Sequence, residues 1–115
     1  MAVRKRNNQA GLITLLNQAL GWELRAQAMY AHYAAYVKGL ESLALTGHFE
    51  AESAESVAHA KQVRDVISIL GGEAVTARDK APIVHTGDTR AMLKEALKTE
   101  AAAADIYRKI VPQVK

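Results

Sequence analysis

Hydrophobic side chains recur along this chain at alternating steps of four and three residues, the spacing that places them on one face of an α-helix. The pattern is clearest between Leu45 and Leu70, where both ends of the face are apolar and its centre is polar. Its members are Leu45, Phe49, Glu52, Ser56, His59, Val63, Val66 and Leu70. The pattern predicts a helix that begins near Glu41 and stops at Gly71 and Gly72.

The same spacing predicts an earlier helix from about Ala10 to Lys38, ended by Gly39. One carboxylate interrupts its apolar and aromatic face, whose members are Leu12, Leu16, Ala19, Glu23, Ala26, Tyr30, Tyr33 and Val37. Taken alone, Glu23 is better explained as a residue at the edge of the face that pairs with an arginine such as Arg25 or Arg64.

A third helix is predicted from Thr89 to Val111, capped by Asp88 and ended at Pro112. Its face again carries one carboxylate near the middle: Leu93, Leu97, Glu100, Ala104, Tyr107 and Val111. The ion-pair explanation offered for Glu23 applies equally to Glu100.

The segment from Glu73 to Asp88 has no helical period and contains Pro82 and Gly87. A connection of about 16 residues is long for two helices that simply turn back on each other. It favours a crossover that makes the third helix run parallel to the second. We therefore predict one all-α domain, residues 1–115, built from three long helices. His85 is interpreted as a surface loop residue.

Composition narrows the class of protein without identifying it. Half of the 115 residues are hydrophobic, only two are proline and none is cysteine, so thiol chemistry and disulfides are excluded. The chain has no apolar run long enough for a membrane span and no secretory signal, and we predict a cytoplasmic protein. A net charge of +3 is too mild to indicate nucleic-acid binding. Residues 1–9, with Arg4, Lys5 and Arg6, are interpreted as a solvated basic tail.

Each of the three helices places a carboxylate near the middle of its apolar face, and the second helix adds an imidazole. Burying such groups is costly unless something pairs with them, and a metal ion is one such partner. The candidate ligands are Glu23, Glu52, Glu55, His59 and Glu100. Oxygen-rich ligation with an imidazole suits iron or manganese, and less specifically zinc. Diiron carboxylate bundles are built in this way.

Three stretches resemble successive helices of bacterioferritin and related ferritin-like proteins: LNQALGWELRAQAMYAHYAAY, ESVAHAKQVRDVISILGG and LKTEAAAADIYRKI. The resemblance is to the ferritin-like superfamily, closest to diiron carboxylate proteins of the bacterioferritin and rubrerythrin type. It implies a ferritin-like bundle with a diiron site. It also implies that Glu23, His59 and Glu100 are ferroxidase ligands and that Tyr30 lies beside the metal site.

The sequence departs from this family at three points. Ser56 stands where the family has a bridging glutamate three residues before the histidine, so Glu52 or Glu55 would have to substitute for it. Val57 stands where bacterioferritin has its haem-binding methionine, and we therefore predict no haem. A fourth helix is absent before Lys115, so the fourth side of the site is expected from another chain or a further segment, or the site is incomplete.

The leading functional hypothesis is iron binding with oxidation of Fe(II), for iron storage or detoxification. The alternative is an oligomeric helical interaction module with a vestigial metal site. A third hypothesis, a nucleoid-associated ferritin-like protein, would use the basic tail. Three amphipathic helices leave an apolar strip open, so we predict a homo-oligomer, at least a dimer. Trp22, Tyr36 and Val37 are expected near its interface.

Overall fold

Three long α-helices account for most of the chain. The computed structural model describes residues 2–114, with side chains described from Gln9 onward. Its elements are α1 (Ala2–Tyr36), α2 (Ser42–Ile69), α3 (Thr89–Ile110) and a final 3₁₀ turn, η1 (Val111–Val114). The described residues contain no β-strand, so the predicted all-α fold is confirmed. None of the described helices combines membrane-spanning length with sufficient hydropathy.

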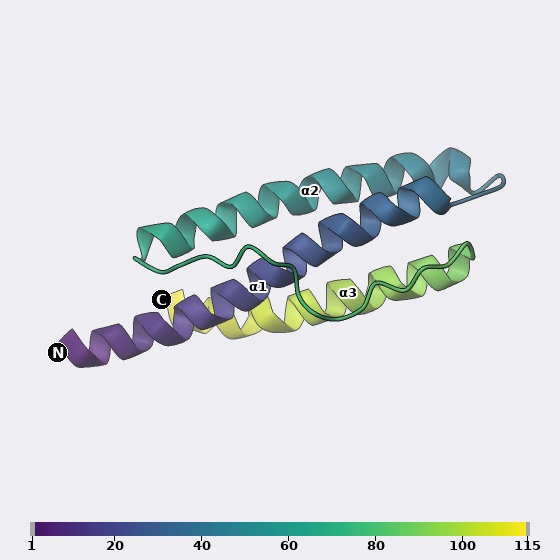
Figure 1. Cartoon of the computed structure of the whole chain (residues 1–115). Helices are drawn as coiled ribbons and strands as arrows, with labels where there is room; N and C mark the ends of the chain where they lie inside the picture. Colours follow the sequence, from purple (N-terminus) through teal and green to yellow (C-terminus); the bar gives the residue numbers. More distant parts are fainter. Residues whose placement is uncertain (1, 115) are drawn as a thin grey trace.

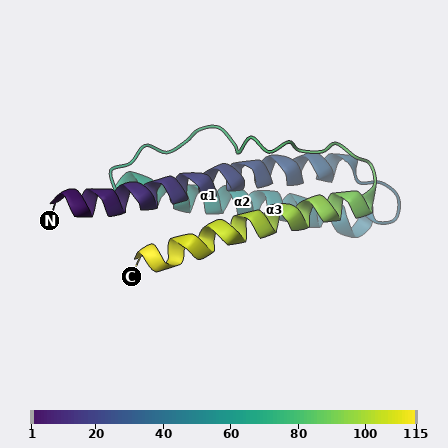
Figure 2. The same ribbon diagram turned by 90° about the horizontal axis from the view of Figure 1, so that it is seen from below.

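The helix α1 is the centre of the molecule and packs against both α2 and α3. It runs antiparallel to both, because the crossover, residues 70–88, carries the chain back along the bundle before α3 begins (Figure 1). Turned by 90°, the crossover is seen to follow α1 on the side away from α3 (Figure 2). The molecule is therefore elongated, with extents of 60 × 23 × 19 Å.

The helix ends follow the signals in the sequence, with one exception. Gly39 and Gly71 both have left-handed backbone, at φ values of +71° and +80°, where they end α1 and α2. Asp88 caps α3, and its Oδ2 accepts the Ala91 N–H at 2.9 Å. The exception is the start of α1 at Ala2, within the segment interpreted as a tail. The side chains of Arg4, Lys5 and Arg6 lie outside those described.

The apolar face predicted for α1 is confirmed. Its eight members are all buried: Leu12, Leu16, Ala19, Glu23, Ala26, Tyr30, Tyr33 and Val37. Val37, expected near an interface between copies, is therefore part of the chain's own core. Trp22 is partly buried against the core, while Tyr36 is 43% exposed.

The face predicted for α3 is wrong by one position. The helix buries Met92, Thr99, Ile106 and Ile110 against the bundle. Leu93, Leu97 and Val111, predicted to be buried, are 44, 71 and 57% exposed. The cause is that apolar residues occupy two adjacent faces of α3, and periodicity alone does not say which of them α1 covers.

The core is divided into two apolar clusters along the bundle axis. One contains Leu16, Leu20, Val63 and Ile106. The other contains Met29, Tyr33, Phe49 and Met92. Between them lies a level of buried polar side chains, among which are Glu23, Arg25, Ser53, Ser56 and Thr99. The polar centre of the predicted helix faces is thus placed at mid-bundle.

Candidate metal centre

A cavity of about 240 Å³ opens at this polar level, with walls from all three helices. Its lining includes every predicted ligand: Glu23 from α1, Glu52, Glu55 and His59 from α2, and Glu100 from α3. Ser56, Thr99, Tyr107 and three alanines complete the wall. Folding thus brings together five candidate ligands that are separated by up to 77 positions in the sequence.

Glu23 is the most buried of the candidate ligands, at 7% exposure. Its Oε2 accepts a hydrogen bond from the Tyr107 hydroxyl at 2.6 Å and lies 3.5 Å from His59 Nδ1. Burial raises the pKa of the Glu23 carboxyl, and the Tyr107 hydrogen bond and the nearby His59 only partly oppose this. A positive ion at this position would reverse the electrostatic cost of the buried carboxylate.

The remaining candidate ligands are more accessible. His59 Nε2 lies 3.8 Å from Glu55 Oε1, and their side chains are 45 and 59% exposed. The Tyr30 hydroxyl donates to Glu100 Oε1 at 2.8 Å, so Tyr30 does lie beside the candidate centre. Burial, and then the hydrogen bond to Glu100, raises the pKa of the Tyr30 phenol. Tyr30 therefore stays protonated at neutral pH and remains a donor.

The ligands share a cavity without converging on a single point. Among the described residues, no three His, Cys, Asp or Glu side chains form a set that could hold a metal ion. The hydroxyls of Tyr107 and Tyr30 donate hydrogen bonds to the carboxylates of Glu23 and Glu100. The donor chemistry fits iron, but side-chain rotation of the accessible glutamates would be needed to complete a coordination sphere.

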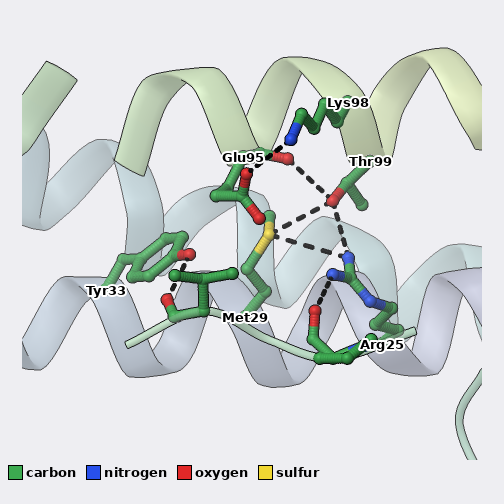
Figure 3. Close-up of polar contacts among 8 residues, drawn as sticks. Arg25, Met29, Tyr33, Glu95, Lys98 and Thr99 are labelled. Atoms are coloured by element: carbon green, nitrogen blue, oxygen red, sulfur yellow. Dashed lines mark hydrogen bonds and ion pairs between the residues drawn. The ribbon is translucent and has the colours of Figure 1, made fainter. Parts of the chain in front are cut away.

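Arg25 does not pair with Glu23, contrary to the ion-pair explanation. The buried guanidinium donates from Nε to Ala81 O at 2.9 Å and from Nη2 to Pro82 O at 2.6 Å. Its Nη1 donates to Thr99 Oγ1 at 2.7 Å, within the network drawn in Figure 3. Arg25 thereby ties the crossover and α3 to α1.

Sequence reasoning did not identify Tyr107 as a site residue. The signal was available, because Tyr107 lies seven positions after Glu100 and so shares its helix face. The role of Arg25 was also missed, since it depends on carbonyl groups of the crossover, a segment that has no periodicity. Thr99 was missed because it meets Arg25 across two helices.

Comparisons with known proteins agree with this architecture. The family model of the ferritin-like domain matches residues 13–115. A crystal structure described as ferritin-like, diiron-carboxylate proteins from Bacillus anthracis strain Ames superposes with a TM-score of 0.87 at 32% identity. The alignment covers 92% of this chain and 75% of that one. No curated protein matches the sequence. The chain belongs to the ferritin-like family.

Proposed function

We propose that this protein binds iron in the mid-bundle cavity and oxidises Fe(II) there. The observation that carries the proposal is that Glu23, Glu52, Glu55, His59 and Glu100, from three helices, line one cavity. Membership of a family with a diiron-carboxylate relative supports the choice of metal. Manganese or zinc would suit the same ligands less specifically.

Each residue has a distinct part in this proposal. Glu23 supplies a buried negative charge that attracts Fe(II), and Tyr107 fixes the direction of its carboxylate. His59 supplies an imidazole nitrogen, while Glu55 or Glu52 takes the place of the glutamate that is missing at Ser56. Each Fe(II) loses one electron to dioxygen or peroxide, which takes up protons from solvent as it is reduced. Haem is not part of the proposal, because Val57 offers no axial ligand.

The proposal includes assembly with a second copy of the chain. The α3 face that carries Glu100 continues in both directions as the exposed residues Leu93, Leu97 and Val111. On α2, Val66 is 41% exposed on the face that carries Glu52 and His59. A two-fold partner that covered both faces would close the open side of the cavity.

Metal analysis and Fe(II) oxidation of the purified protein test the function. Iron added without oxygen should bind to the wild-type chain, and admission of air should convert it to Fe(III). His59→Ala should lose most of the bound iron, because the site keeps no other imidazole among its lining residues. His48→Ala is the matched control, an exposed histidine on the same helix but outside the cavity.

The alternative function, a helical interaction module with a vestigial metal site, gives a different result. It is favoured by Ser56 at the bridging position and by the exposed apolar face of α3. In that case His59→Ala would raise stability and leave the metal content unchanged, and the wild-type chain would not oxidise Fe(II). That outcome would reject the iron site.

A further inference from the structure

A pair of histidines lies apart from the cavity, where the crossover passes the second half of α1. The Nε2 atom of His32 and the Nδ1 atom of His85 are 2.8 Å apart. His32 is partly exposed and His85 is exposed, so solvent reaches the pair. Neither residue lines the candidate metal centre. In the metal-free protein one of these two ring nitrogens donates a hydrogen bond and the other accepts it. To bind a metal through both nitrogens, the donating ring must carry its proton on its other nitrogen.

The crossover is anchored to α1 just before His85 and forms a local turn just after it, which together position the imidazole. The Tyr33 hydroxyl donates to Val84 O at 2.7 Å, one residue before His85. One residue further back, Ile83 packs against the core cluster of Met29 and Tyr33. On the other side, Thr86 Oγ1 accepts the Asp88 N–H at 3.0 Å. The loop therefore presents His85 to α1 with little freedom left to lose on binding a ligand.

The ring of Tyr36 packs beside both imidazoles. Its ring centroid lies 4.7 Å from that of His32 and 4.6 Å from that of His85. The tyrosine ring contacts both imidazoles and limits their rotation. The two nitrogens are thus held close together by residues of α1 and of the crossover, which are far apart in the sequence.

We propose that His32 and His85 form a surface site for a divalent transition-metal ion, with Cu(II) preferred over Ni(II). With metal–nitrogen bonds of about 2.0–2.1 Å, the observed separation corresponds to an angle of about 85° at the metal. That angle suits the square-planar or tetragonal geometry of Cu(II) and Ni(II), whereas a tetrahedral ion needs the nitrogens about half an ångström further apart. Cu(II) also binds nitrogen ligands more tightly.

The rest of the coordination sphere comes from solvent. No third His, Cys, Asp or Glu in the part of the chain that is described completes a metal-binding group with this pair. The site is therefore a two-imidazole chelate whose nitrogens are already close together, and small ring rotations would turn them from each other toward the metal. It is independent of the iron site proposed in the cavity. It can bind Cu(II) even if the cavity binds no iron.

Titration of the metal-free protein with Cu(II), followed by calorimetry and electron paramagnetic resonance, tests the site. The wild-type chain should bind a Cu(II) ion whose spectrum shows two coordinated imidazole nitrogens, apart from any Cu(II) held in the cavity. His32→Ala and His85→Ala should each weaken this binding at least tenfold. His85→Gln keeps a hydrogen-bonding side chain but not the imidazole, and should weaken it as much without lowering the melting temperature.

Two controls distinguish Cu(II) binding at this site from binding by other histidines. His48→Ala removes an exposed histidine elsewhere and should leave Cu(II) binding unchanged. His59→Ala removes the cavity imidazole and should leave the two-nitrogen signal intact, even where it abolishes iron binding. Unchanged affinity in both His32→Ala and His85→Ala, or a spectrum with one nitrogen only, would overturn the proposal and leave the pair as a simple hydrogen bond.

Discussion

At the scale of single residues, the central feature is a carboxylate buried away from water. Glu23 is buried on α1 and depends on Tyr107 and His59 for polar contacts. Its position on the buried face was predictable from spacing alone. Its partner Tyr107 was predicted to share an α3 face with Glu100 but was not recognised as a site residue, because periodicity shows which residues share a face and not which atoms meet across two helices.

Glu23→Gln should stabilise the metal-free protein at neutral pH while reducing iron binding. Burial raises the Glu23 pKa above its ordinary value of 4.5, so the folded state binds a proton more readily than the unfolded chain. The resulting stability is fully present below the ordinary value and is lost as pH rises through the raised pKa. Glutamine carries no charge to desolvate and still accepts the Tyr107 hydrogen bond. We expect a gain on the order of 1 kcal/mol at pH 7.

The measurement is urea unfolding of both proteins, without metal, at several pH values from 4 to 8. The gain from Glu23→Gln should grow as pH rises and vanish near the acid end. Glu50→Gln is the matched control, since Glu50 is an exposed glutamate outside the cavity. A loss of stability at pH 7, or a gain independent of pH, would show that the buried charge is not the cause.

At the scale of elements, the crossover shows what a sequence does and does not reveal. Its length and its lack of period predicted a connection that carries the chain back along the bundle, and the parallel α2 and α3 confirm this. Its docking was not predictable, because Arg25 binds the carbonyl oxygens of Ala81 and Pro82. Every residue has a carbonyl, so such contacts leave no mark on the sequence.

Arg25→Lys should loosen the crossover. A lysine ammonium cannot reproduce the fork that reaches two carbonyls and the Thr99 hydroxyl at once, so buried acceptors would lose their partner. Hydrogen bonds to charged groups contribute about 1.5–3 kcal/mol each, and we expect a loss of at least about 2 kcal/mol in the free energy of unfolding. Trypsin should then cleave faster after Arg78 and Lys80, which lie just before the anchor.

Arg64→Lys serves as the control for this change, because Arg64 is exposed on α2. It should alter neither stability nor the rate of cleavage. If trypsin cleaves the Arg25→Lys variant at the wild-type rate, other contacts hold the crossover in place. Those contacts include the hydrogen bond from Asp79 N to Gly21 O at 2.9 Å. They also include two hydrogen bonds of the Asn17 side chain, which donates to Glu73 O and accepts from Val75 N.

At the scale of the whole molecule, the bundle has one uncovered side. The helix α1 lies between α2 and α3, which are not in extensive contact with each other, and the cavity lies between them. The face predicted for α3 from its spacing, with Leu93 and Leu97, flanks this opening instead of facing α1. No described helix of the chain covers these leucines, and the proposed assembly would bury them. A second copy is the simplest cover.

Leu97→Lys should break the assembly. Leu97 is 71% exposed in the single chain, so in a monomer the change costs little. In a two-fold assembly each copy would place a charged group in an apolar contact, where a buried leucine contributes about 1.5–3 kcal/mol. Light scattering and sedimentation at micromolar concentration should show the wild-type chain as a dimer or larger and Leu97→Lys as a monomer.

The control is Leu40→Lys, since Leu40 is 83% exposed in the turn between α1 and α2, and this change should leave the assembly intact. A folded wild-type monomer of 12.5 kDa would contradict the closed site, and iron bound to such a monomer would mean that three helices suffice to hold it.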